Sequence, residues 1–505
     1  MTGKLLIKNV WLADGTGKPL RRGACLTAHD GTVAAVEKEF SGCCAEEVFD
    51  GRGAILSPGF IDAHGHSDIS ALSAPECFSK VSQGVTTEII GNCGLSAFPL
   101  TPENKEHLEI LYRNYDFPLT WETGSDYLET VQGSACRLSL VPLVGHNTLR
   151  AAVRGYEKGA CSARELERMC QLLERELKSG AAGLSFGLLY TPGLFAEADE
   201  IAALMKTAAM QNKICTAHLR SEGDRLLESI SEMVGLALEA GLKRFHVSHL
   251  KTAGLANHGK LDKVLELFED AERRGVEITC DRYPYIESMT QLSVALPAPW
   301  SELDDEALKK KLCSTEEQRV LMADLRIARE PEYWERCRLV NTPHPRFVSY
   351  RGRKVTSIPG DVVENVVELL SFDPVNCQAA FSGMSEENMK RIIKLPFCVA
   401  GSDGNALPGD SRFGTSHPRA FGAVARFLRL CLDEGCSIEE SVRKVTQKSC
   451  EIFGLADRGV LLPGKRGDLV VFDPDGIDSK ADFVSPETPA EGIVCVVKNS
   501  EMIYN

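Results

Sequence analysis

Gly59-Phe60-Ile61-Asp62-Ala63-His64-Gly65-His66 is an apolar, strand-like run that leads directly into two histidines spaced two residues apart. Side chains two apart on a strand point the same way, so both imidazoles can hold one metal ion or bind one substrate. Four later apolar runs also end in side chains that bind metals: Cys93, His218, His249 and Asp403. A barrel enzyme builds its site at one rim from this repeated pattern of strand, ligand and turn.

Eight apolar runs alternate with stretches of helical periodicity such as 163–178 and 221–239. This alternation predicts the α/β class, and eight such units predict a (β/α)8 TIM-like barrel. The expected barrel strands are Ile55–Ala63, Val85–Gly91, Leu138–Val144, Ala181–Phe186, Ile214–Ala217, Phe245–Ser248, Glu277–Cys280 and Phe397–Gly401.

The two ends of the chain share a different pattern, with short alternating runs broken by Asp-Gly and Gly turns. We therefore expect residues 1–57 and 425–505 to build one small β-sandwich domain together, with some helix in the second segment, beside a barrel at 58–424. The stretch between the seventh and eighth strands is too long for one helix. Residues 288–350, rich in charge and proline, predict an inserted subdomain over the barrel mouth.

The composition is that of a globular protein, with 505 residues, 43% hydrophobic and 25% charged. A net charge of −14 argues against nucleic acid or an anionic membrane as partner and leaves a small-molecule substrate. The first residues lack a signal-peptide core, and no stretch reaches the length of a membrane span. The 18 scattered cysteines indicate free thiols in a reducing cytoplasm. The oligomeric state is not encoded in these patterns.

Cys93, His218 and His249 form the stronger candidate metal site. Thiolate and imidazole ligands suit Zn²⁺, and three protein ligands leave one position open for water. A core thiol or a structural histidine is the ordinary explanation for any one of these residues. Six such residues at the strand ends of one barrel are poorly explained by packing, which favours the metal site.

His64, His66 and Asp403 form a second, adjacent candidate metal position. Asp403 precedes a glycine, so it is either an ordinary turn aspartate or a general base that takes a proton from water and passes it to the leaving amine. Its place beside the other ligands favours the catalytic role. His246 lies three residues before His249, so we expect it to face the helices and bind nothing. We expect structural roles for His258, His344 and His417.

Taken together, the motifs resemble the amidohydrolase superfamily and, within it, the N-acyl-D-amino-acid deacylases (D-aminoacylases), over almost the whole chain. They comprise Pro58-Gly59-Phe60-Ile61-Asp62-x-His64-x-His66, Gly91-Asn92-Cys93-Gly94, Gly145-His146-Asn147-x-Leu149-Arg150, His218-Leu219-Arg220-Ser221-Glu222-Gly223-Asp224, Tyr283-Pro284-Tyr285, Ser402-Asp403-Gly404 and His417-Pro418-Arg419-x-Phe421-Gly422. The resemblance implies one tightly held zinc on Cys93, His218 and His249. It implies a weaker or empty second metal position near His64, His66 and Asp403.

An absent lysine supports this placement. Dihydroorotase-like and hydantoinase-like relatives bridge two metals with a carboxylated lysine after the fourth strand, whereas residues 183–190 here contain none. Cys93 would take the bridging role if two metals bound. The resemblance also implies that the substrate α-carboxylate is held by Lys251, Tyr283, Ser288 and Arg419, with Tyr190 nearby. Cationic and hydroxyl donors suit a carboxylate, and arginine can bind it bidentately.

The activity expected from the resemblance is zinc-dependent hydrolysis of N-acyl-D-amino acids, with Asp403 as general base and then acid and His66 helping to hold the oxyanion. Two alternatives stay open: a cyclic amidase or deaminase of the same superfamily, and a non-catalytic barrel. The sequence leaves the preferred side chain undefined. An acidic D-amino acid would require further cations, and the insert offers Arg346, Arg351, Arg353 and Lys354.

Overall fold

The computed structural model describes residues 2–410 and 412–505, and its centre consists of two parallel sheets. One has the strand order β6-β7-β8 and the other β17-β13-β12-β11-β10-β9. The strands are β6 (Phe60–Asp62), β7 (Val85–Ile90), β8 (Ser139–Pro142), β9 (Val144–Gly145), β10 (Gly183–Gly187), β11 (Ile214–His218), β12 (Arg244–Val247), β13 (Glu277–Arg282) and β17 (Cys398–Ala400). Each of the eight predicted runs overlaps one of these strands.

The two parallel sheets adjoin at both edges. Only Leu143 separates β8 from β9. At the other edge, the Ala63 amide donates to the Ala400 carbonyl at 2.9 Å, and the Asp403 amide donates to the His64 carbonyl at 2.7 Å. The strand pairing therefore gives an α/β architecture with two adjoining sheets, whereas the sequence predicted one closed ring.

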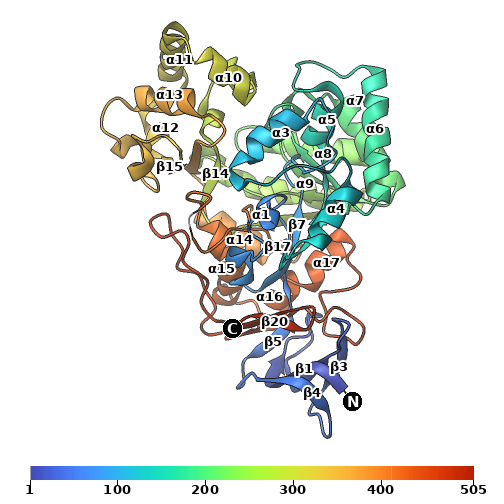
Figure 1. The fold of residues 1–505 in the computed structure, drawn as a ribbon. Coiled ribbons are helices and arrows are strands. Elements are labelled where there is room, and N and C mark those ends of the chain that lie inside the picture. Colours follow the sequence, from blue (N-terminus) through green and yellow to red (C-terminus); the bar gives the residue numbers. More distant parts are fainter. Residues whose placement is uncertain (1, 411) are drawn as a thin grey trace.

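Helices cover the outside of these sheets (Figure 1). Helix α6 shows why they form where they do: Ser162 and Glu165 make a capping box, and Met169, Leu172 and Leu173 face the core. The covering helices are α1 (Ser70–Ser73), α2 (Phe78–Val81), α3 (Lys105–Tyr112), α4 (Gly124–Gly133), α5 (His146–Arg154), α6 (Ala163–Lys178), α7 (Ala198–Met210), α8 (Leu226–Glu239), α9 (Leu261–Arg273), α14 (Glu386–Lys394), α15 (Arg419–Asp433), α16 (Ile438–Lys444) and α17 (Gln447–Phe453). The predicted boundary at 424 falls inside α15.

Strands from both ends of the chain share one eight-stranded sheet at the bottom of Figure 1. Its order is β20-β19-β18-β5-β1-β2-β3, and β4 pairs with β1. The predicted two-layer sandwich stays a prediction. The strands are β1 (Thr2–Leu12), β2 (Arg21–Thr27), β3 (Val33–Glu37), β4 (Cys44–Asp50), β5 (Ile55–Pro58), β18 (Leu469–Phe472), β19 (Ile493–Lys498) and β20 (Glu501–Tyr504).

A separate unit follows β13 and forms the upper left lobe in Figure 1. It has its own three-stranded sheet, β14-β16-β15, and its own hydrophobic cluster from Leu292 to Ala379 around Trp300 and Trp334. This inserted unit therefore continues past residue 350. Its elements are β14 (Glu287–Gln291), α10 (Asp305–Lys311), α11 (Thr315–Ala328), α12 (Pro331–Glu335), β15 (Cys337–Asn341), α13 (Val362–Phe372) and β16 (Gln378–Ser382).

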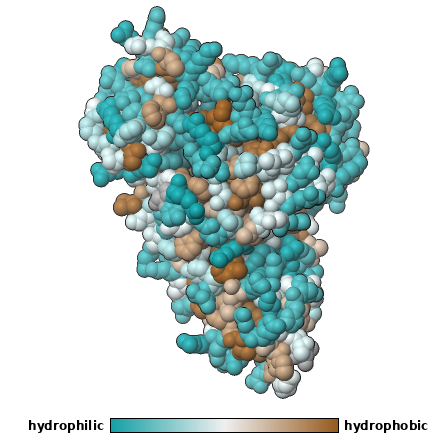
Figure 2. All heavy atoms as spheres, viewed as in Figure 1, coloured by the Kyte–Doolittle hydropathy of each residue, from teal (hydrophilic) through white to brown (hydrophobic). Residues whose placement is uncertain are grey.

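The visible surface carries hydrophobic side chains scattered among hydrophilic ones (Figure 2). Within the described residues, no helix combines the length and the apolar character needed to cross a bilayer. All 18 cysteines are free.

Candidate active site

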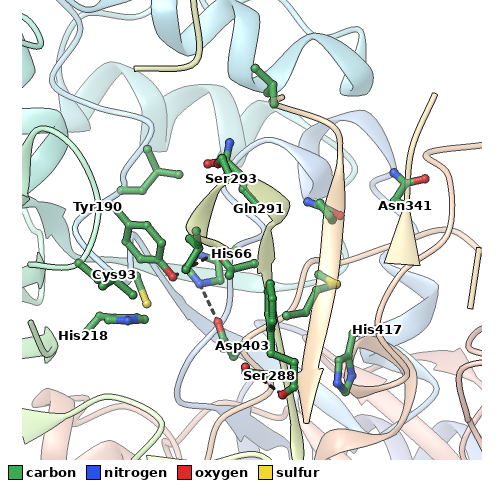
Figure 3. Close-up of a pocket in the computed structure, with 18 of the residues that line it drawn as sticks. His66, Cys93, Tyr190, His218, Ser288, Gln291, Ser293, Asn341, Asp403 and His417 are labelled. Carbon is green, nitrogen blue, oxygen red and sulfur yellow. Dashed lines mark hydrogen bonds and ion pairs between the residues drawn. The ribbon is translucent and has the colours of Figure 1, made fainter. Parts of the chain in front are cut away.

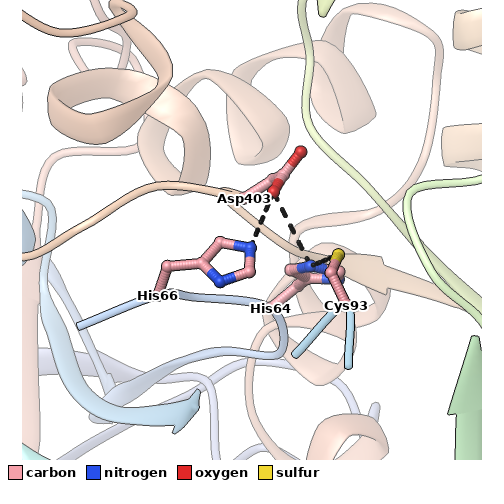
Figure 4. Close-up of side chains that lie close together, drawn as sticks. All are labelled: His64, His66, Cys93 and Asp403. Atoms are coloured by element: carbon pink, nitrogen blue, oxygen red, sulfur yellow. Dashed lines mark hydrogen bonds and ion pairs between the residues drawn. The ribbon is translucent and has the colours of Figure 1, made fainter. Parts of the chain in front are cut away.

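Six of the predicted ligands meet at the carboxyl ends of the parallel strands. They form two groups, and within each group the ligand atoms all lie within 4.8 Å of one another. The first group is Cys93, His218 and His249. The second is His64, His66, Cys93 and Asp403, shown in Figure 4. Cys93 belongs to both groups, so it lies where a bridging ligand would be needed.

Cys93 is the centre of the cluster. Its Sγ lies 3.3 Å from His64 Nε2 and 3.3 Å from His249 Nε2. Burial raises the pKa of the Cys93 thiol, but the adjacent imidazoles outweigh burial and hold that pKa well below its usual value. The neighbouring imidazoles therefore favour the thiolate, which is the form of cysteine that binds metals.

The ligand loops leave their strands in an unusual backbone conformation. Cys93, His249 and Asp403 have φ values of 52°, 37° and 52°, in the left-handed region that residues other than glycine rarely adopt. Such conformations cluster at functional sites, where the surrounding structure enforces them. All three side chains are thus turned toward the common centre by the first residues after each strand.

Gly65, between His64 and His66, has no room for a side chain because Glu88 packs directly against it. A Cβ at Gly65 would lie 1.6 Å from Glu88 Oε1. The tight approach allows β6 to pack on β7 while His64 and His66 flank the carboxylate of Asp403. His66 Nε2 lies 3.0 Å from Asp403 Oδ1, and His64 Nε2 lies 3.7 Å from the same atom.

The cluster passes an independent test for a metal ion. His218 is 5% exposed, yet neither of its ring nitrogens has a hydrogen-bond partner among the described residues. Buried polar atoms are nearly always paired, so an unpaired imidazole beside a thiolate points to a ligand. One thiolate and imidazole nitrogens are a donor set typical of zinc.

Asp281, which the sequence reasoning missed, supports the histidines from below. Its Oδ2 lies 3.0 Å from His64 Nδ1 and 3.0 Å from His246 Nε2, and its Oδ1 accepts from the His249 amide at 3.0 Å. His246 belongs to neither ligand group and bonds Asp281 and Thr279 instead, so its lack of a ligand stays a prediction. The available signal was a charged residue inside the apolar run of β13.

Glu222 belongs to the motif that begins at His218 and had no predicted role, and it organises the opposite side of the site. Its Oε1 accepts from Lys251 Nζ at 2.6 Å and lies 2.9 Å from His249 Nδ1, while Oε2 lies 3.6 Å from His218 Nε2. Lys251 is only 4% exposed, so it faces the pocket and not solvent.

Arg419 and Tyr283 lie beside Asp403. Arg419 Nη1 is 2.9 Å from Asp403 Oδ2, and its guanidinium stacks over the Tyr283 ring at 4.8 Å. Tyr283 is fully buried, and its hydroxyl has no hydrogen-bond partner among the described residues. Burial raises the pKa of Asp403, but Arg419 and then His66 outweigh it and hold that pKa well below its usual range.

Five of the six ligands, all but the buried His64, open with Glu222, Lys251, Tyr283 and Arg419 onto one cavity of about 970 Å³ between the parallel sheets and the inserted unit (Figure 3). Tyr190 packs against His218 with ring centroids 4.9 Å apart. Ser288, on β14, contacts the Phe381 carbonyl at 3.4 Å and faces the cavity. The structure thus brings all five predicted substrate contacts to one pocket.

The remaining histidines differ from one another. His258 and His344 lie away from the ligands. His258 bonds the Gly383 carbonyl, and His344 lies 3.5 Å from Glu368. His417 lines the pocket, bonds the Glu287 carbonyl at 3.0 Å and accepts from the Arg419 amide at 3.0 Å.

A buried lysine, also missed in the sequence, ties the Asp403 loop to the first parallel strand. Lys80 Nζ lies 2.7 Å from Asp62 Oδ2, 2.7 Å from Ser402 Oγ and 2.9 Å from the Gly404 carbonyl. Ser402 and Gly404 flank Asp403, so Lys80 fixes the loop on both sides of that carboxylate.

Comparison with known proteins agrees with this geometry. The family model described as "Amidohydrolase family" matches residues 47–504. The N-acyl-D-glutamate deacylase of Alcaligenes xylosoxydans xylosoxydans is 31% identical over 99% of this chain and 93% of its own length. The D-aminoacylase of the same organism is 30% identical over 99% of this chain and 94% of its own length.

Solved structures give the same result. The N-acyl-D-glutamate deacylase of Bordetella bronchiseptica, complexed with zinc and a phosphonate mimic of the tetrahedral intermediate, has a TM-score of 0.83 at 31% identity, over 100% of this chain and 97% of its own. D-hydantoinase, at 12% identity and a TM-score of 0.55 over 99% of this chain and 94% of its own, shares the fold alone. The chain belongs to the N-acyl-D-amino-acid deacylase family of the amidohydrolase superfamily.

Proposed function

We propose that this chain hydrolyses N-acyl-D-amino acids to a carboxylic acid and a free D-amino acid. One observation carries the proposal: a thiolate–histidine ligand set, the Asp403 carboxylate and the buried Lys251 and Arg419 share a single pocket. The D configuration is supported by the relatives, whose names specify D-glutamate, D-aspartate and D-amino acids.

Cys93, His218 and His249 would hold one zinc ion tightly, and His64, His66 and Asp403 would complete a weaker second position. A bound zinc supplies Lewis-acid polarisation of the amide carbonyl and lowers the pKa of a water molecule. A solved D-aminoacylase with a binuclear metal centre is described as showing one-metal activation and second-metal attenuation, which agrees with unequal positions.

Asp403 is the proton carrier in this proposal. Its carboxylate lies beside the ligand cluster, where it can accept a proton from the attacking water and return it to the leaving nitrogen. His66, 3.0 Å away, orients the Asp403 carboxylate and helps to hold the developing oxyanion.

The substrate α-carboxylate is expected at Arg419, Lys251 and the unpartnered Tyr283 hydroxyl, with Ser288 and Tyr190 at the edge of this anchor. Buried cationic and hydroxyl donors are the groups that bind a carboxylate most strongly. An anchored carboxylate places the amide bond at a fixed distance from the ligands, which is what a hydrolase requires.

We also propose that the two parallel sheets act as one (β/α)8 barrel, closed through Leu143 and the Ala63–Ala400 hydrogen bond. The inserted unit then spans 287–382. Because α15 and α16 pack against β17, the second part of the terminal domain begins after α17. The 18 free thiols support a cytoplasmic location.

The test is amine release from paired N-acetyl-D- and N-acetyl-L-amino-acid pools by zinc-loaded protein. Release from the D pool alone is expected. Release from neither pool, with zinc measured in the protein, would contradict the proposal and direct the search to cyclic amides and deamination substrates.

A further inference from the structure

The charges around the pocket restrict the substrate side chain. We infer that this chain prefers N-acyl-D-amino acids with an uncharged side chain over N-acyl-D-glutamate and N-acyl-D-aspartate, because the described residues of the pocket offer no fully buried cation that is free for a second carboxylate. The inference rests on the proposed function and specifies its substrate class. Identity does not decide the matter, since the D-glutamate, D-aspartate and D-aminoacylase relatives are 31%, 30% and 30% identical to this chain.

Both buried cations of the pocket are already paired. Lys251 is bound to Glu222 at 2.6 Å and Arg419 to Asp403 at 2.9 Å. The same two cations are the anchor for the α-carboxylate that every N-acyl-amino acid carries. A second carboxylate on the side chain therefore meets no buried cation that is still available to it.

The cations of the insert that could have served an acidic side chain lie elsewhere. Arg346 pairs with Glu368, Arg351 bonds the Thr342 carbonyl, and Lys354 lies 3.7 Å from Glu335. Arg353 is exposed. None of the four lines the cavity, so their positions do not favour an acidic substrate.

Acidic side chains outnumber lysines and arginines along the cavity wall. Among the described residues, four acidic side chains line it against three lysine or arginine side chains, and Asp224 and Asp305 lie on the wall with Glu222 and Asp403. His107 also lines the cavity, and burial lowers its pKa to about 4, so it is neutral. An entering side-chain carboxylate would lose water and face like charge.

The wall supplied by the inserted unit is mostly uncharged, and its charged members are Asp305 and Arg336. Gln291, Ser293 and Asn341 face the cavity in Figure 3, and Leu296 and Trp300 line it from the second hydrophobic cluster. Asn341 is 9% exposed, and its Oδ1 has no hydrogen-bond partner among the described residues. Such a wall can accept aliphatic or amide-bearing side chains without leaving a charge unpaired.

The closing experiment compares N-acetyl-D-glutamine with N-acetyl-D-glutamate on zinc-loaded protein. The two substrates match in shape and differ in one charge. We expect kcat/KM for the glutamine substrate to be higher by about tenfold or more. Equal values, or a preference for glutamate, would overturn the inference while leaving the deacylase activity in place. Release from no N-acetyl-D-amino acid would overturn the proposed function, and the inference with it.

Arg336 is the one lining cation whose guanidinium has no carboxylate partner among the described residues, and it provides the control. It is half-buried beside Tyr333. R336Q is expected to leave the glutamine-to-glutamate ratio unchanged. A selective loss of glutamate hydrolysis in R336Q would show that Arg336 receives an acidic side chain, and this would also overturn the inference.

Discussion

The six candidate metal ligands, here called the rim, and the inserted unit face each other across the cavity. The side chains of the rim are more deeply buried and have more polar partners than those of the inserted unit. At the rim, His64 and His249 are at most 1% exposed, and each has several polar partners close to 3 Å. On the opposite wall, all five residues of β14 are only half-buried, and Ser288 has one contact at 3.4 Å. From this contrast we expect the chemistry at the tightly bonded ligands and the selection of the substrate side chain at the loosely bonded wall of the inserted unit.

The largest expected effect comes from the rim carboxylate itself. Asp403→Asn keeps the shape but removes the proton acceptor, so kcat is expected to fall by about 100- to 10,000-fold. Steady-state kinetics with the zinc content measured in parallel would check this. A variant that keeps most of its rate with metal bound would assign the proton transfer to another group.

Replacing Lys80 tests the rigidity of the rim. Lys80→Met leaves Asp62 and Glu88 as buried carboxylates without their cation, and the free energy of unfolding is expected to fall by about 3–5 kcal/mol. Urea denaturation measures this directly. A loss below about 1 kcal/mol would mean that the loop around Asp403 is held by other contacts.

A smaller effect is expected on the inserted wall. Ser288→Ala removes one predicted hydrogen bond to the substrate α-carboxylate, so KM is expected to rise about three- to tenfold with kcat nearly unchanged. Ser371→Ala, which removes one hydrogen bond to a backbone carbonyl in the same unit but outside the cavity, is the matched control. An unaltered KM in the Ser288 variant would remove this residue from the anchor.

The smallest effect is expected at the surface of the inserted unit. Arg346 and Glu368 form an ion pair whose side chains are 50% and 38% exposed. Arg346→Met is expected to change the free energy of unfolding by less than about 1 kcal/mol, because solvent screens exposed pairs. A change as large as that for Lys80→Met would erase the contrast between the two regions.

The sequence predicted the six candidate ligands of the rim far better than the buried residues that position them, Lys80 and Asp281. Five of the parallel strands are apolar runs that lead into a candidate ligand and a turn, and both the burial and the turn are local signals. Cys93, His218 and Asp403 could therefore be identified one run at a time. The inserted unit has no such repeat, and its predicted end at 350 missed β16, which completes the small sheet.

The sequence did not reveal the roles of Lys80 and Asp281, because the residues that they contact are distant in sequence. Lys80 bonds Asp62 and also reaches Ser402, 322 residues away, and Asp281 joins His64 across 217 residues. A lone lysine in a helix is usually a solvated charge. Only the three-dimensional packing shows that this one is fully buried between two carboxylates.

Glycine would relax the backbone at Cys93, His249 and Asp403, where left-handed residues each cost about 1–3 kcal/mol. A glycine at any of these positions would also remove a side chain from the ligand cluster. Stability and activity are therefore opposed at the same three residues.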